Sequence, residues 1–94
     1  METLYLKVEI RKTLQDEREE INYYILENEL YGLKITRVYN NTAFEKEEIV
    51  MENIFKDEND AKSVIDLIVN QGNDLSQIEY VVEDYNKGLS ERNN

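Results

Sequence analysis

The sequence lacks the residue types on which most small enzymes depend. Its 94 residues include no His, no Cys, no Trp and no Pro. His and Cys are the usual groups for proton transfer, nucleophilic attack and transition-metal ligation. Without cysteine no disulfide framework forms, and we expect the chain to reside in the cytoplasm. These absences predict a protein that is not an enzyme and that holds no metal and no cofactor.

Glycine and long apolar runs are scarce as well. The three glycines, Gly32, Gly72 and Gly88, lie too far apart for a phosphate-cradling or dinucleotide-binding loop. The longest apolar run covers residues 23–26, far below the roughly 20 residues that cross a bilayer. The first residues also lack the basic and apolar segments of a signal peptide. We therefore expect no membrane as a partner.

What the chain has in excess is negative charge. Twenty-one acidic residues face eleven basic ones, which gives a formal net charge of −10. Binding to phosphates needs clustered Lys and Arg, so nucleic acid is not expected as a direct partner. A calcium loop beginning at Asp57 is excluded, because its sixth and twelfth positions hold Lys62 and Ile68. The acidity then serves either solubility or the recognition of a protein partner.

Alternating apolar and polar residues predict four strands. They cover residues 4–11, 21–26, 30–39 and 44–55. Apolar side chains of the first strand are expected on one face: Leu4, Leu6, Val8 and Ile10. Gly32 predicts a bulge or bend in the third strand, because an interior glycine weakens a regular strand. The charged first half of the fourth strand is typical of a sheet edge.

The period changes to that of a helix after residue 57. Apolar residues then recur on one helical face: Ala61, Val64, Ile65, Ile68 and Val69. Asp57 is typical of a helix N-cap, and Gly72 of a C-terminal stop.

A second helix is predicted from the capping box of Ser76 and Glu79, with Ser76 as its N-cap. Leu75 and Tyr80 are expected to form the matching hydrophobic staple. The helix is predicted to stop near Gly88.

Four strands followed by two helices predict an α+β fold, a four-stranded antiparallel sheet with both helices packed on one face. The length allows one hydrophobic core. We predict a single compact domain over residues 1–88 and a frayed polar tail over residues 89–94.

The negative charge is heaviest in the helical part. Residues 57–94 hold nine acidic and three basic residues, a net charge of −6, whereas residues 1–56 hold twelve and eight, a net charge of −4. Carboxylates spaced along a rigid surface can imitate a phosphate backbone; the alternative is an ordinary solvated face. The acidic candidates for partner binding, which capping does not explain, are Glu45, Glu47, Glu48, Glu58, Asp66, Glu83 and Asp84.

Seven tyrosines supply a second group of candidates. Tyr23 and Tyr85 are predicted to face the core. By parity, Tyr5 and Tyr24 are expected on the opposite face of the sheet, next to Leu26. Exposed tyrosine is enriched at protein interfaces, so this face is a candidate partner or dimer surface. The alternative is that strands simply favour tyrosine.

Parts of the chain resemble an uncharacterised family of short Firmicute proteins. The resemblance rests on Tyr31-Gly32-Leu33-Lys34-Ile35, on residues 48–54, on the apolar face of the first helix and on residues 75–85. The ending Val81-Val82-Glu83-Asp84-Tyr85 is similar to the Asp-Val-Ile-Glu-Asp-Phe helix of that family, while Ile78-Glu79 replaces its His-Leu. The family has no established activity, so the resemblance implies a fold and adds almost nothing about function.

These observations predict a small acidic protein that binds and inhibits or regulates a macromolecular partner. In its sharpest form it is a nucleic-acid mimic, such as an anti-CRISPR, whose partner is a basic nucleic-acid-binding protein. One alternative is a housekeeping regulatory domain that forms a homodimer through its sheet. Another is a small enzyme or metal-binding protein that uses carboxylates alone.

Overall fold

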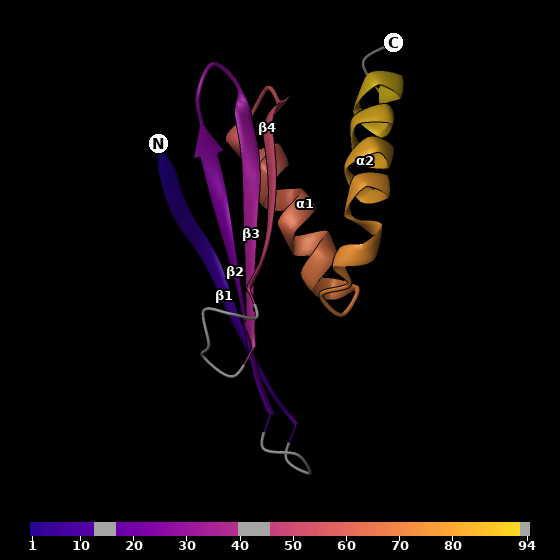
Figure 1. Ribbon diagram of the computed structural model, residues 1–94. Helices are drawn as coiled ribbons and strands as arrows, with labels where there is room; N and C mark the ends of the chain where they lie inside the picture. The colour runs from indigo at the N-terminus through magenta and orange to yellow at the C-terminus, as the bar shows by residue number, and fades with distance from the viewer. Residues whose placement is uncertain (13–16, 40–45, 93–94) are drawn as a thin grey trace.

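A computed structural model describes residues 1–12, 17–39 and 46–92 of the chain (Figure 1). The strands are β1 (Glu2–Lys12), β2 (Glu17–Glu27), β3 (Tyr31–Tyr39) and β4 (Lys46–Phe55). They are followed by α1 (Glu58–Asn70), the single 3₁₀ turn η2 (Leu75–Gln77) and α2 (Ile78–Arg92).

The strands form one antiparallel sheet in the order β1-β2-β3-β4, so each strand pairs with its neighbours in the sequence. Both helices lie on the same side of this sheet (Figure 1). The α+β prediction is therefore confirmed. One face of the sheet is covered by helices, and we call the other the open face.

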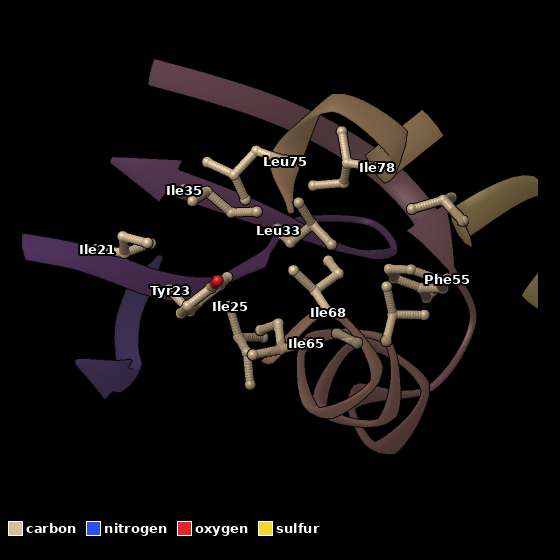
Figure 2. Close-up of a cluster of buried hydrophobic side chains, with 13 residues drawn as sticks. Ile21, Tyr23, Ile25, Leu33, Ile35, Phe55, Ile65, Ile68, Leu75 and Ile78 are labelled. Carbon is tan, nitrogen blue, oxygen red and sulfur yellow. The ribbon is translucent and has the colours of Figure 1, made fainter. Parts of the chain in front are cut away.

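The core forms between the helix-facing side of β2 and β3 and the apolar face of α1 (Figure 2). Tyr23 of β2 and Leu33 of β3 are completely buried, and they meet Ile65 and Ile68 of α1. Leu75 and other apolar residues of η2 and α2 close the core from the side. Each such side chain contributes on the order of 1.5–3 kcal/mol by leaving water. The apolar face that alternation predicts for β2 thus packs against the apolar face that the helical period predicts for α1.

A bulge in β1 changes the predicted faces of its first residues. The register passes from Leu4 opposite Tyr24 to Leu6 opposite Tyr23, which leaves Tyr5 as the extra residue. Leu6 and the apolar residues after it stay on the helix-facing side, as predicted. Leu4, however, lies on the open face with 50 % of its surface exposed. The prediction for Leu4 was wrong, because a bulge reverses the alternation on one of its sides.

A second irregularity lies beside Gly32, between Tyr31 and Leu33 in the pairing of β3 with β4, but the bulge is in the fourth strand and not in the third, where it was predicted. The excess residues lie on β4, around Asn53, whose φ is +55°. The Oδ1 atom of Asn53 accepts a hydrogen bond of 3.1 Å from the backbone N–H of Leu30. A Cβ atom at Gly32 would lie 2.2 Å from the carbonyl oxygen of Met51. Glycine is therefore required here by the close approach of β4.

Both predicted ends of α1 are confirmed. The side chain of Asp57 accepts a hydrogen bond of 2.9 Å from the backbone N–H of Asn59. At the other end Gly72 adopts a φ of +81°. Its N–H donates to the carbonyl of Val69, and the N–H of Asn73 donates to that of Ile68. These two bonds form a Schellman motif, which satisfies the last carbonyls of the helix.

The predicted beginning of the second helix was wrong in its details. Asp74, and not Ser76, is the capping residue, and its carboxylate accepts hydrogen bonds from the Ser76 N–H (3.0 Å) and hydroxyl (2.6 Å). The cap precedes η2, and α2 begins at Ile78. Leu75 is buried whereas Tyr80 is 73 % exposed, so the expected staple is not formed.

The predicted end of the second helix was also wrong. The backbone of α2 continues through Gly88 to Arg92, beyond the predicted stop near Gly88. A glycine ends a helix by adopting a positive φ, and among the described glycines only Gly72 does so.

Candidate partner-binding surfaces

The candidate sites predicted from the sequence are surface carboxylates and tyrosines. Within residues 1–12, 17–39 and 46–92 no group of three or more His, Cys, Asp or Glu is placed to hold a metal ion. No helix among the described residues is long and apolar enough to cross a membrane. The charges and the exposed apolar residues of these surfaces decide what they can bind.

The acidic residues of the sheet are largely paired with basic residues. Lys7 lies 2.8 Å from Glu20 across β1 and β2, and Lys34 lies 2.7 Å from Glu2. The contact with Glu20 raises the pKa of Lys7, and the same contact lowers the pKa of Glu20. The contact with Glu2 raises the pKa of Lys34. Cross-strand pairing therefore neutralises much of the charge on the open face.

Arg37 pairs with acidic residues of neighbouring strands on the helix-facing side of the sheet, beyond the core. Its guanidinium pairs with Glu19 of the neighbouring strand and lies 4.0 Å from Glu47. It also lies over the ring of Tyr39, with 5.2 Å between the guanidinium carbon and the ring centre. One cation thus serves two carboxylates from the strands on either side of it.

The helices have far fewer ion pairs. Of the seven ion pairs among the described residues six lie within the sheet, and the remaining one joins Lys62 to Glu58 on α1 at 3.6 Å. On α2 the carboxylates of Glu79, Glu83 and Asp84 are exposed and have no ion-pair partner in the described part of the chain. Asp57, Asp60 and Asp66 at α1 accept hydrogen bonds, so the helical carboxylates without any described partner lie on α2.

A second set of unpaired carboxylates lies at one end of the sheet. Glu27 is the last residue of β2, Glu29 lies in the connection between β2 and β3, and Glu52 lies in the irregular part of β4. All three are exposed, and none forms an ion pair with a described residue. Because this set lies outside the helices, it provides a comparison for the surface of α2.

The predicted acidic candidates do not form one continuous surface. Glu47 and Glu48 are neighbours on β4 and so point to opposite faces of the sheet. Glu48 lies 3.7 Å from Lys46. Glu45 lies outside the described residues.

The four helical candidates differ in their partners. Glu58 is paired with Lys62, and Asp66 accepts hydrogen bonds from the Tyr5 hydroxyl at 3.1 and 3.3 Å. Only Glu83 and Asp84 remain without a partner among the described residues.

Tyr5 lies on the side of the sheet opposite to the one predicted. As the extra residue of the β1 bulge it faces α1, where its hydroxyl donates to Asp66. The ammonium of Lys62 lies 5.9 Å from its ring centre. Burial and the hydrogen bond to Asp66 raise the pKa of Tyr5. Tyr5 therefore anchors β1 to α1 and is not part of the open face.

Tyr24 does lie on the open face, as predicted. It belongs to a row that crosses all four strands in register: Leu4, Tyr24, Lys34 and Val50. Leu4 and Val50 are about half exposed, whereas Leu26, the other predicted member of this surface, is only 9 % exposed. The Lys34 ammonium lies 5.5 Å from the Tyr24 ring centre and covers part of the ring. Alternation within single strands did not reveal this row, because it depends on the register between strands.

The chain matches no family model, no curated protein and no solved structure. The resemblance to the short Firmicute family therefore stays a prediction.

Proposed function

We propose that this is a non-catalytic cytoplasmic protein that binds a basic nucleic-acid-binding protein through the exposed carboxylates of α2 and thereby inhibits it. In the sharpest form of this proposal it is an anti-CRISPR. The supporting observation is the unequal pairing of charge: six of the seven described ion pairs lie in the sheet, and none involves α2. The carboxylates of α2 therefore remain available to a basic partner, whereas most carboxylates of the sheet already contact a cation.

The spacing of these carboxylates supports mimicry of a nucleic acid. Glu79 and Glu83 are one helical turn apart and share a face, and Asp84 follows directly. At 1.5 Å per residue the three charges span about 7.5 Å, so neighbouring charges are on average about 3.8 Å apart along the helix axis. Duplex DNA carries one charge per about 1.7 Å, and each strand one per about 3.4 Å. The mean spacing of the charges on α2 is thus close to the spacing along a single DNA strand.

The core holds this helix firmly in place. The ring of Tyr85 packs edge-on against Phe55, with ring centres 6.3 Å apart. Its hydroxyl donates a 2.9 Å hydrogen bond to Asp60 of α1, and the Asn86 amide donates to the carbonyl of Ile54 at 3.2 Å. A helix fixed to both α1 and the end of β4 presents its carboxylates at constant spacing, which lowers the entropic cost of binding.

Affinity capture from a bacterial lysate tests the proposal. Immobilised protein is expected to retain a basic nucleic-acid-binding protein, identified by mass spectrometry, which is released by salt and displaced by added duplex DNA. Reversing two charges, Glu83→Lys with Asp84→Lys, is expected to abolish this capture.

A matched variant distinguishes the effect of the α2 surface from the effect of the overall net charge. Glu27→Lys with Glu29→Lys changes the net charge equally, at exposed carboxylates outside the helices. This variant is expected to capture the partner normally. Equal losses in both variants, or the absence of any DNA-displaceable partner at low salt, would contradict the proposal.

The alternative, a housekeeping regulatory domain that dimerises through its open face, has less support. Of the three residues expected to form that surface only Tyr24 is available there, because Tyr5 faces α1 and Leu26 is nearly buried. A dimer of this kind predicts that Tyr24→Glu abolishes self-association in light scattering.

A further inference from the structure

The outer side of β1 is an unpaired sheet edge. β1 runs over Glu2–Lys12, and among the described strands it pairs only with β2. Every second residue of such a strand directs its N–H and C=O groups away from the sheet, where another strand can bind them. The bulge at Tyr5 interrupts the regular strand near its beginning, so the straight part available for pairing begins at Leu6.

This straight part has two different faces. Leu6, Val8 and Ile10 lie on the helix-facing side, where they pack against the core but remain half-buried because none of the described strands lies beyond them. Lys7 and Glu9 lie on the open face, and their side chains are 48 % and 59 % exposed. The edge therefore offers an incompletely covered apolar row on one side and one charge of each sign on the other.

We propose that β1 pairs antiparallel with β1 of a second copy of this chain, with the two-fold axis passing through Val8. In this register Lys7 of each copy stands opposite Glu9 of the other, so two attractive pairs form on the open face. On the helix-facing side Leu6 stands opposite Ile10 twice, and the two Val8 residues meet on the axis. The two four-stranded sheets become one continuous eight-stranded sheet, with the same patch of each copy in the interface.

Charge selects this register over its neighbours. A shift of one residue would set the apolar row of one copy against the charged row of the other. With the axis at Lys7 two lysines stand opposite each other. With the axis at Glu9 two glutamates meet, and Lys7 stands opposite Arg11. Like charges directly opposite in an antiparallel pair are destabilising.

The next register toward the end of β1 is also less favourable. With the axis at Ile10, Glu9 stands opposite Arg11, but Val8 stands opposite Lys12. The apolar row of one copy then has no apolar counterpart in the other. Of these registers, the one about Val8 places apolar residues opposite apolar residues on the helix-facing side and opposite charges opposite each other on the open face.

Contacts within each copy support the same arrangement. Lys7 contacts Glu20 on the inner side at 2.8 Å and Glu9 on its own strand at 3.7 Å. A second Glu9 arriving from the partner places Lys7 between carboxylates on both sides. Charged residues at sheet edges usually prevent pairing, but here their alternation makes the edge complementary to itself.

Two charge reversals test the inference with the purified chain alone, and the result does not depend on the proposed function. The unchanged protein is expected to show a concentration-dependent dimer by analytical ultracentrifugation. Glu9→Lys sets lysines opposite lysines, and Lys7→Glu sets glutamates opposite glutamates. Each is expected to raise the dimer dissociation constant about tenfold.

A mixture of the two variants is expected to form a heterodimer, because every Lys then faces a Glu again. Their net charges, −8 and −12 after changes of two charges from −10, have the same sign, so general attraction cannot produce this result. Glu27→Lys is the control, since it alters the charge as Glu9→Lys does but lies outside β1. Circular dichroism establishes that each variant is folded. If loss of the Glu20 contact unfolds Lys7→Glu, the dimer dissociation constant of Glu9→Lys alone tests the inference.

Three results overturn the inference. One is a monomer at every concentration of the unchanged protein. Another is a dimer that Glu9→Lys leaves intact, which would place the interface elsewhere. The third is a mixture of two folded variants that stays monomeric, which would exclude the register about Val8.

Discussion

The hydroxyl of Tyr23 donates a hydrogen bond of 2.7 Å to the Oδ1 atom of Asn73. Tyr23 lies in the middle of β2 and is completely buried, while Asn73 follows Gly72 in the Schellman motif that ends α1. One bond therefore joins the sheet to the loop that leads from α1 to α2.

We predict that Tyr23→Phe lowers the free energy of unfolding by about 1 kcal/mol. The ring still fills its place in the core, so the loss is that of one hydrogen bond whose acceptor is half-exposed and can bind water. Urea denaturation followed by circular dichroism measures it. Tyr80→Phe, at an exposed position, is expected to change nothing, and an equal loss there would contradict the assignment.

The same residue predicts a dependence on alkaline pH. Burial raises the pKa of Tyr23 from its ordinary value of 10.0 to about 12. Above pH 10 the unfolded chain loses this proton while the folded chain keeps it, so the unfolded state binds fewer protons and is favoured. The contribution of the protonated Tyr23 hydroxyl to the free energy of unfolding is complete below pH 10 and is lost as the pH rises to about 12. Denaturation midpoints across this range are expected to fall less steeply in Tyr23→Phe, and parallel curves would contradict the prediction.

Two glycines are expected to respond oppositely to alanine. In Gly32→Ala the new Cβ atom would meet the backbone of Met51 at 2.2 Å, which forces β4 to move. We expect a loss of about 2–3 kcal/mol or more, since backbone cannot yield as a side chain does. In Gly88→Ala the Cβ atom enters open space on a helix, and a gain of about 0.5–1 kcal/mol is expected. Thermal unfolding of both variants checks the pair, and a change of the same sign would contradict it.

The start of η2 provides a prediction that separates two neighbouring residues. Asp74→Ala removes the acceptor of both the Ser76 N–H and the Ser76 hydroxyl, whereas Ser76→Ala removes only the second donor. The Asp74 variant is therefore expected to unfold at the lower temperature. A larger effect of Ser76→Ala would restore the capping role that the capping-box pattern assigns to serine.

Local periodicity predicted the fold because the relevant signals act within a few residues. The alternation in β2 and the helical period of α1 each follow from their own residues, and a cap such as Asp57 needs only the next turn. The end of α2 was predicted wrongly by the same reasoning, because a glycine signals a helix end only where its φ becomes positive, and Gly88 remains helical.

The surfaces were harder to predict because they depend on which residues meet across the sheet. Tyr5 was assigned to the open face by counting, and only its pairing with β2 shows the bulge that directs it to α1. The contact of Lys34 with Glu2 joins residues far apart in the sequence. Glu83 and Asp84 were predicted as acidic candidates from the sequence. Only the ion pairs of the folded chain show which of the acidic candidates lack a basic partner.

The order β1-β2-β3-β4 also has a consequence for folding during synthesis. Each strand pairs with the one made immediately before it, so the sheet grows by one hairpin at a time without waiting for distant residues. The helices that cover its apolar face are made after all four strands. Until α1 arrives, the growing sheet presents Tyr23, Leu33 and Ile35 to water, and this nascent stage is when the chain most needs protection from aggregation.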